Sequence, residues 1–145
     1  MTATSPEPGL VISYAYLWHS EYLSGQEEGL KDRPCVIISA TPQPGGWQRV
    51  LVLPITHSPP SSPDLVQEIP VTVRQHLRLD DERCWIILSE MNEFHWPGPD
   101  LGRSAPGHEL VYERLPPRFF EKIRQRFIAT ITACAGRATR VRRTR

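Results

Sequence analysis

The amino-acid sequence predicts a small, mostly β (α+β) domain with one long helix at its C-terminal end. The 15 prolines among 145 residues are about twice the usual share, and they disfavour long helices because proline lacks the backbone donor that helix interiors need. Short runs rich in Val, Ile and Tyr recur between clusters of Gly, Pro and Ser, as is typical of strands joined by turns. Apolar residues at helical spacing form a long stripe only near the C-terminus.

Five apolar runs are predicted as strands. The first run, GLVISYAYL, is rich in the β-branched and aromatic residues that suit a pleated surface. The third run contains Pro54, which indicates an edge strand or a bulge because proline cannot donate to a neighbouring strand. The five predicted strands span residues 9–17, 33–41, 47–58, 64–71 and 83–91.

The segments between these strands are predicted as loops, with one short exception. Residues 19–32 are polar with two glycines, and residues 93–107 are crowded with Pro and Gly, so both are expected to be loops. Residues 73–81 carry Val73 and Leu77 at helical spacing, which favours a single helical turn there.

A helix of roughly 18 residues is predicted near the C-terminus. Its apolar residues step by three or four positions and form a one-sided stripe. Proline at the start suits a first helical turn, and Gly136 is a suitable C′ residue. Laid across the open side of a curved antiparallel sheet, this helix would close an SH3-like barrel of five to six strands. The stripe consists of Phe120, Ile123, Phe127, Ile131 and Cys134.

The predicted domain organisation is a single barrel domain with short extensions. Residues 1–8 are expected to be a flexible leader and residues 9–136 the barrel domain. Residues 137–145 hold five of the 17 basic residues and no acid, so they are expected to be a disordered tail or a non-specific contact to phosphates. The other 136 residues hold 12 basic and 16 acidic residues, a net charge of −4.

The cysteine pattern and the hydropathy exclude several classes of protein. Cys35, Cys84 and Cys134 are odd in number and form no CxxC pair, which argues against a disulfide framework or a zinc site. Buried thiols in a reducing cytosol are expected instead. The sequence shows neither a signal-peptide pattern nor 18 consecutive apolar residues, so we expect a cytoplasmic protein without a membrane span.

Three sequence blocks, in order, resemble the PemK/MazF family of ribonuclease toxins. They are GLVISYAYL, KDRPCVIIS and RVLVLPITHS, and the later block WIILSEMN and the final helix are also similar to family elements. The resemblance covers about residues 9–135. It implies the barrel fold of the PemK/MazF/CcdB type.

The resemblance also implies a function. Members are cytoplasmic toxins of type II toxin–antitoxin pairs, usually homodimers, each blocked by a cognate antitoxin protein. They cleave single-stranded RNA without a metal or other cofactor. The 2′-hydroxyl attacks the adjacent phosphate and leaves a 2′,3′-cyclic phosphate and a 5′-hydroxyl.

Metal-free RNA cleavage needs a proton acceptor, a group that stabilises the phosphorane charge and a proton donor. Arg33 occupies the position of the family's catalytic arginine, and Thr56 that of its phosphate-contacting threonine. Glu90 resembles the acidic residue that some members use as base. His57 and His19 are further candidates, although His57 can join Thr56 only where the strand bulges or ends, because neighbouring strand residues face opposite ways.

Other residues are predicted to bind RNA rather than to react with it. Exposed tryptophans can stack on bases, and basic side chains can contact phosphates. By contrast, Trp85 lies in an apolar run and is expected in the core. Leu88 stands where some members carry a further catalytic arginine, so that residue is missing here. The predicted RNA-binding residues are Lys31, Arg49, Trp18, Asn92, His95 and Trp96.

A second class of function stays open from the sequence. The same barrel could be a non-catalytic binding module, either a gyrase poison of the CcdB type or a protein that binds nucleic acid or partners only. The net charge of −4 outside the tail favours this alternative, because a nucleic-acid groove needs local positive charge. Clustering of Arg33, Lys31 and Arg49 would supply that charge.

Overall fold

The structure confirms a mostly β fold with a C-terminal helix. It is a computed structural model that describes residues 5–25, 32–96, 111–133 and 139–142. Three α-helices and one 3₁₀ helix are described: α1 (His19–Leu23), α2 (Val71–Leu77), α3 (Pro117–Ala133) and η1 (Pro63–Leu65). The described strands are β1 (Leu10–Tyr14), β2 (Arg33–Pro42), β3 (Gln48–Thr56), β4 (Val66–Glu68), β5 (Trp85–Ile87), β6 (Glu90–Trp96), β7 (Val111–Arg114) and β8 (Thr139–Arg142).

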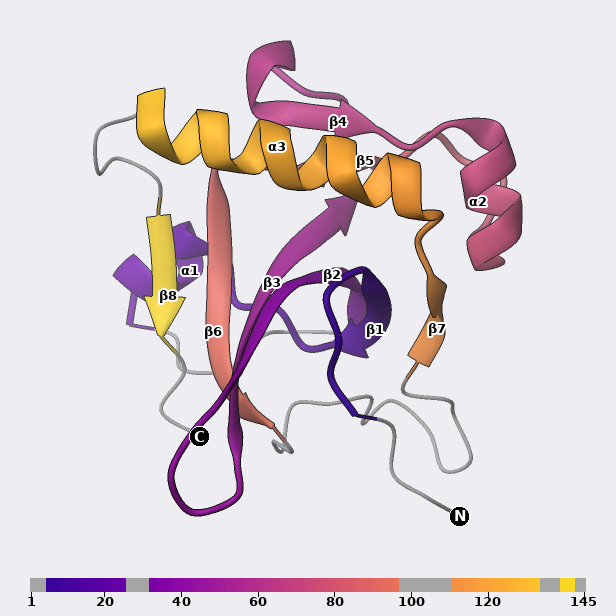
Figure 1. The fold of residues 1–145 in the computed structure, drawn as a ribbon. Coiled ribbons are helices and arrows are strands. Elements are labelled where there is room, and N and C mark those ends of the chain that lie inside the picture. Colours follow the sequence, from indigo (N-terminus) through magenta and orange to yellow (C-terminus); the bar gives the residue numbers. More distant parts are fainter. Residues whose placement is uncertain (1–4, 26–31, 97–110, 134–138, 143–145) are drawn as a thin grey trace.

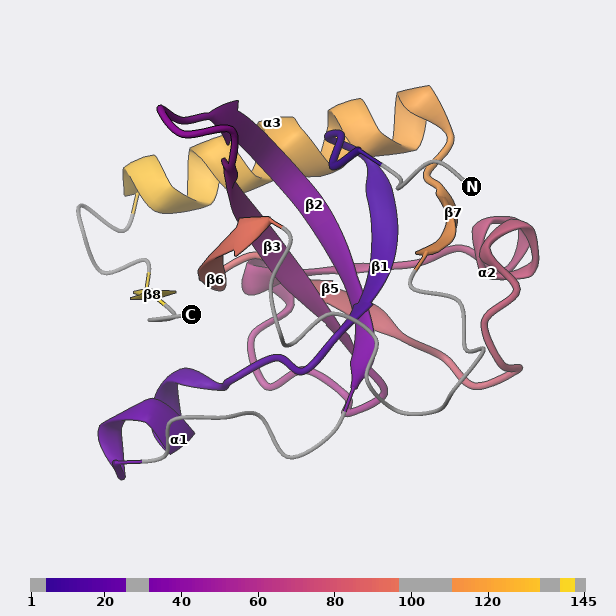
Figure 2. The same cartoon turned by 90° about the horizontal axis from the view of Figure 1, so that it is seen from below.

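A long hairpin of β2 and β3 forms the centre of a curved, largely antiparallel sheet (Figure 2). On one side β2 pairs with β1, which pairs with β7. On the other side β3 pairs first with β6 and then, towards its C-terminal end, with β5. The described strands therefore curl around the β2–β3 hairpin, as expected, although their match to the SH3-like barrel stays a prediction.

Pro54 lies in a central strand, which corrects the expected edge or bulge. The pairing of β3 with β6 ends at Val52, and its pairing with β5 begins at Ile55. Pro54 thus falls in the gap between two ladders, where a missing backbone donor does no harm on that side. The partner switch, not an edge position, accommodates the proline.

The run predicted as one strand over residues 83–91 is two strands. It divides into β5 and β6, with Leu88 and Ser89 between them, and Glu90 begins β6 instead of ending a strand. Strand β6 continues to Trp96, into the segment predicted as a loop over residues 93–107. The part of that segment from residue 97 onward lies outside the described residues.

Apolar side chains fill both faces of the sheet. Strand β1 is buried along its whole length, with Val11 in the core beneath α3 and Ile12 in a second core on the opposite face. Helix α3 lies across the sheet (Figure 1) and buries Ile123 and Phe127 against it. This burial on both faces explains why the strand sequences read as continuous apolar runs.

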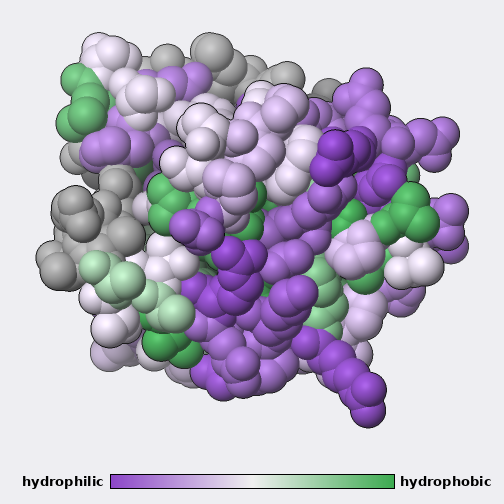
Figure 3. All heavy atoms as spheres, turned by 90° about the horizontal axis from the view of Figure 1, so that it is seen from above, coloured by the Kyte–Doolittle hydropathy of each residue, from purple (hydrophilic) through white to green (hydrophobic). Residues whose placement is uncertain are grey.

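The outer side of α3 is polar, as the one-sided stripe predicted. Figure 3 shows hydrophilic side chains crossing the face that carries this helix, with smaller apolar patches around them. Ile128, which is 45% exposed, is the one exposed large apolar residue among the described residues of α3. No helix within the described ranges is both long and apolar enough to cross a membrane.

The described parts of both chain extensions contact the rest of the fold. Within the tail over residues 137–145, β8 pairs in parallel with β6, and Arg142 binds the carboxylate of Glu93 at 2.9 Å. Glu93 is only 6% exposed, so this ion pair compensates a buried charge. Within the leader over residues 1–8, Glu7 forms an ion pair with Arg114.

The expectation of buried thiols is confirmed for two cysteines. Cys35 and Cys84 are free and buried, and Cys134 lies outside the described residues. Burial raises the pKa of both thiols, to about 11 for Cys84. Trp85 is also buried, as predicted.

Arg78 adopts a strained backbone conformation at the end of α2. Its φ of 60° lies in the left-handed region, which side chains with a Cβ disfavour, and it is the one non-glycine residue in the described segments with a positive φ. Its guanidinium has no hydrogen bond or ion pair with the described residues. The Arg78→Gly substitution should therefore raise the free energy of unfolding by about 1 kcal/mol, measured by urea denaturation. An unchanged or lower value would show that the side chain stabilises the fold.

Candidate functional site

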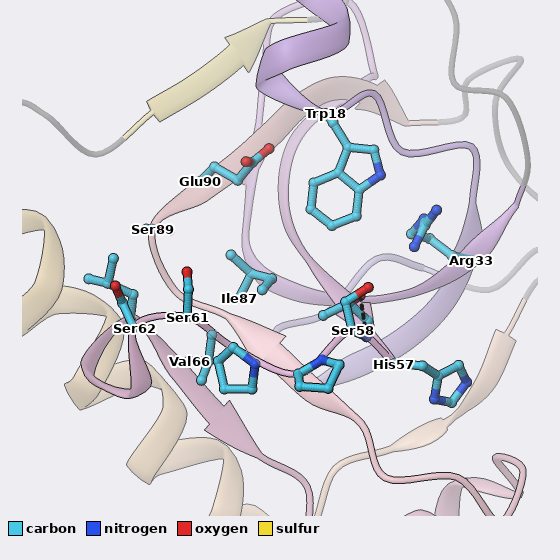
Figure 4. A pocket seen from close by; sticks show the side chains of 14 residues that line it. Trp18, Arg33, His57, Ser58, Ser61, Ser62, Val66, Ile87, Ser89 and Glu90 are labelled. Atoms are coloured by element: carbon cyan, nitrogen blue, oxygen red, sulfur yellow. Dashed lines mark hydrogen bonds between the residues drawn. The ribbon is translucent and has the colours of Figure 1, made fainter.

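A pocket of about 620 Å³ opens where β2 begins and β3 ends. Arg33 is the first residue of β2, Thr56 the last of β3, and both line this pocket. The strand register explains their proximity: Cys35 pairs with Pro54, so two residues further along Arg33 lies opposite Thr56. Glu90, the first residue of β6, lines the same pocket (Figure 4). His57 also lines it, so the structure brings together four of the five residues predicted to be catalytic.

The Arg33 side chain is held by an aromatic ring and is free to bind an anion. Its guanidinium carbon lies 4.9 Å from the centre of the Trp18 ring, a cation–π contact. The Nε atom is buried and has no hydrogen-bond partner. A buried donor without a partner carries a desolvation cost that a bound phosphate would relieve.

Thr56 retains a free hydroxyl proton. Its Oγ1 accepts a hydrogen bond from the backbone N–H of Ser58 at 3.1 Å, so the oxygen is oriented by the turn that follows β3. The hydroxyl hydrogen is left to donate to an oxygen in the pocket. This geometry suits contact with a non-bridging phosphate oxygen.

Glu90 is partly buried and bound through one oxygen only. Its Oε1 accepts hydrogen bonds from the Tyr16 hydroxyl at 3.0 Å and from the His19 backbone N–H at 3.1 Å. Its Oε2 accepts no hydrogen bond from the described residues. Burial raises the pKa of Glu90 above its ordinary value, although the two hydrogen bonds lower it in part. Burial, and next the charge of Glu90, raise the pKa of Tyr16. A carboxylate with raised pKa and one free oxygen can accept a proton from a substrate.

Asn92 does not face RNA, which corrects its predicted role as a base contact. It is 0% exposed, and its side-chain amide binds both backbone groups of Leu17, each at 2.9 Å. Because alternate strand residues share a face, Glu90 and Asn92 both reach the segment that carries Trp18. These two residues therefore fix the wall of the pocket.

His57 lies at the rim of the pocket with both ring nitrogens engaged. Nε2 is 3.0 Å from Asp80 Oδ2, and Nδ1 is 3.0 Å from the Arg83 carbonyl oxygen. In Figure 4 its ring points away from Glu90. A role in proton transfer would require His57 to leave these partners.

One group of side chains in the described residues has a spacing that could hold a metal ion. Ligand atoms of His57, Asp80 and Glu82 lie within 4.8 Å of one another. All three residues are exposed, and such surface groups commonly pair without a metal.

The other predicted residues that the structure describes are not part of the pocket lining. His19 contributes its backbone N–H to Glu90, while its ring is not part of the lining. Arg49 and His95 pair across β3 and β6 near the far end of the hairpin, where the His95 ring stacks on Trp47 at 3.9 Å. Trp96 is 9% exposed, so it packs in the core and cannot stack on a base, contrary to the prediction. Lys31 lies outside the described residues.

Sequence reasoning missed five polar residues of the site. Tyr16 binds the carboxylate of Glu90, and four serines line the pocket: Ser58, Ser61, Ser62 and Ser89. Serines in a segment rich in Ser and Pro carry no distinctive signal. Tyr16 lies in the first apolar run, where a tyrosine is typical of a strand and indicates no site.

The chain matches no protein-family model and no curated protein. The resemblance to PemK/MazF toxins therefore stays a prediction from the sequence blocks.

The raised pKa of Glu90 predicts a pH dependence of stability. A carboxyl whose pKa is higher in the folded state contributes stability at low pH, and this contribution is lost as the pH rises through that raised pKa. The Glu90→Gln variant keeps an oxygen for Tyr16 and His19 but has no charge to bury. It should therefore gain thermal stability relative to the wild type as the pH rises from 4 to 7.

Glu121→Gln provides a control of opposite sign. Glu121 is exposed, and its hydrogen bond with Arg124 lowers its pKa. Its contribution is present at neutral pH and lost on acidification, so the Gln variant should lose stability relative to the wild type at neutral pH. Parallel melting curves for both variants at pH 4 and pH 7 would check the two signs, and a Glu90→Gln variant that loses stability at pH 7 would contradict the account.

Proposed function

We propose that the chain is a metal-independent endoribonuclease that acts as the toxin of a type II toxin–antitoxin pair. The observation that carries this proposal is that Arg33, Thr56 and Glu90, from three different strands, line one open pocket. Single-stranded RNA is the proposed substrate, and a second copy of the chain and an antitoxin protein are the proposed partners.

The three side chains can divide the reaction between them. Arg33 and Thr56 would donate to the non-bridging oxygens and stabilise the charge that develops on the phosphorane. Glu90 would accept the proton of the 2′-hydroxyl through its free Oε2. The 2′-oxygen then bonds to phosphorus, and the bond to the 5′-oxygen breaks. Water in the open pocket can protonate that leaving oxygen.

Trp18 is the proposed stacking surface next to the phosphate. Its ring is half-buried, is oriented by an edge contact with Tyr16 at 5.1 Å, and lines the pocket. Figure 4 shows this ring between Arg33 and Glu90. A base stacked there would hold the flanking nucleotide while Arg33 binds the phosphate, which would add roughly 1–3 kcal/mol of binding per stacked base.

The test is incubation of the purified protein with a long single-stranded RNA in excess EDTA. The proposal predicts fragments with 5′-hydroxyl and 2′,3′-cyclic phosphate ends, and the 5′-hydroxyl ends are recognised because a kinase labels them without prior phosphatase treatment. RNA that stays intact, or cleavage that stops when EDTA is added, would contradict it.

A non-catalytic binding module is the second candidate, and one observation favours it. Glu90 already accepts hydrogen bonds from Tyr16 and from the backbone of His19, so its role can be purely structural. In that case the pocket would bind a nucleic acid or an acidic partner through Arg33 without cutting it. Binding of RNA in a gel-shift assay with no change in RNA length would select this alternative.

A further inference from the structure

A second pocket adjoins the first. Its volume is about 340 Å³, within the range of about 300–1,000 Å³ that small-ligand pockets occupy. It shares Arg33 and His57 with the first pocket, so the two meet where β2 begins and β3 ends. A strand of RNA whose phosphate lies against Arg33 could therefore place a neighbouring base in the second pocket.

The wall of this pocket contains a carboxylate with one buried oxygen that has no partner. Asp32 lines the pocket, and its Oδ2 is buried without a hydrogen-bond partner. Burying a charged acceptor without a donor costs free energy, and a ligand that supplies donors recovers this cost. A ligand that presents N–H groups to this carboxylate would therefore bind favourably.

A strained arginine lines the same pocket. Arg78 keeps its φ of 60° where glycine would be relaxed, and its guanidinium has no partner among the described residues. This conformation ends α2, where a left-handed residue is common, although glycine is the residue that usually adopts it. Arg78 and Arg33 together offer two cations, which suits a ligand that also carries phosphate.

Apart from His57 and Asp80, which pair with each other at 3.0 Å, the rest of the wall is apolar and aromatic. Ile55 is buried, and Leu79 and Tyr112 are partly buried against the same core. A flat, weakly polar ring is the kind of ligand that fits between such side chains.

We propose that this second pocket binds a guanine base of the RNA substrate next to the scissile phosphate. The inference rests on the proposed function for its placement in RNA. Guanine is the base whose Watson–Crick edge presents two adjacent donors, N1–H and the N2 amino group, and a carboxylate can accept both at once. Adenine and cytosine present a donor beside an acceptor, and uracil presents a single donor between two acceptors, so each would set a lone pair against the Asp32 carboxylate.

The test measures nucleotide binding separately from cleavage. Titration of the full chain with 5′-GMP, IMP, AMP, CMP and UMP by calorimetry should show GMP bound at least about tenfold more tightly than AMP, the discrimination typical of a bidentate contact. IMP lacks the N2 amino group and should fall between them. Equal affinities for GMP and AMP would overturn the proposal.

Three variants separate the carboxylate from other effects. Asp32→Asn should abolish the preference for GMP, and Asp64→Asn, an exposed matched control in η1, should retain it. Arg78→Gly, which is expected to fold at least as stably as the wild type, should weaken GMP binding several-fold through its phosphate. An Asp32→Asn variant that keeps the full GMP preference would overturn the proposal.

Mapping of the cleavage sites distinguishes this inference from the proposed function. Cleavage next to guanine in the wild type, with less selectivity for guanine in Asp32→Asn, would support both the guanine pocket and the proposed nuclease function. A preference for GMP in a chain that never cuts RNA would support the guanine pocket and remove the nuclease. Cleavage that ignores guanine, or a GMP preference with no guanine beside the cut, would overturn the placement of the base in the RNA substrate.

Discussion

Arg33→Ala should reduce the rate of RNA cleavage by about 10²–10³-fold while leaving the fold intact. A donor directed at the charge that develops in the transition state is worth this much when it is removed. The fold should persist because the Nε of Arg33 has no partner, and its cation–π contact with Trp18 contributes only about 0.5–1 kcal/mol at a partly exposed site. Single-turnover cleavage of an end-labelled RNA, with a melting curve for each variant, measures both quantities.

Two further variants sharpen this result. Arg124→Ala removes an arginine that pairs with Glu121 on α3, outside the pocket, and cleavage should change by less than about twofold. Arg33→Lys keeps the charge but loses the planar pair of donors, so its rate should fall between those of the wild type and Arg33→Ala. Full activity in Arg33→Ala would contradict the proposed role of Arg33 and place the reaction elsewhere.

Asn92→Asp should lower the free energy of unfolding at pH 7 by about 3 kcal/mol or more. Asn92 is fully buried and donates to the carbonyl of Leu17 while accepting from its N–H. The Asp side chain has the same shape, but when ionised it loses the donor and places a negative charge beside that carbonyl. Urea denaturation at pH 7 measures the loss.

The same variant should recover much of its stability in acid. A protonated Asp carries an O–H that can replace the lost donor, so the pKa of the new carboxyl should be raised in the folded state. Stability is then present at low pH and lost as the pH rises through the raised pKa. Gln75→Glu, on the exposed side of α2, is the control and should change stability by less than about 0.5 kcal/mol. A pH-independent loss in Asn92→Asp would indicate that packing, not charge, is responsible.

The pairing of Arg33 with Thr56 was predictable because it follows from a hairpin. Two apolar runs joined by the Gly- and Pro-rich turn at residues 42–46 form adjacent antiparallel strands, and the ends remote from the turn then lie side by side. Helix α3 was predictable for a similar reason, because its apolar stripe spans several turns and faces one way.

The full extent of β6 was not predictable from the local composition. The Pro- and Gly-rich segment begins only at Pro97, so Phe94 and Trp96 looked like loop residues although they alternate into the second core. Asn92 looked like a surface amide for the same reason. Its burial depends on the backbone of Leu17, 75 residues away in sequence, and no local pattern reports that contact.

The strand in the tail illustrates the same limit with charge. Five arginines and no acid in residues 137–145 are typical of a solvated terminus. Strand β8 nevertheless pairs with β6, where Glu93 is buried and Arg142 binds it. A charge that is buried by tertiary packing creates a need for a partner that composition alone does not show.

The most direct test of the central claim is an NMR titration that follows the indole N–H signals of the tryptophans with a single-stranded RNA that cannot be cut, fully 2′-O-methylated and of mixed sequence. The described tryptophans occupy distinct places. Trp18 lines the pocket with Arg33, whereas Trp47 stacks on His95 near the far end of the β2–β3 hairpin. Trp85 and Trp96 are buried. If the pocket binds the phosphodiester, the Trp18 signal should shift most, and this shift should vanish in Arg33→Ala. A shift confined to Trp47, or an unperturbed Trp18 at saturation, would contradict the account.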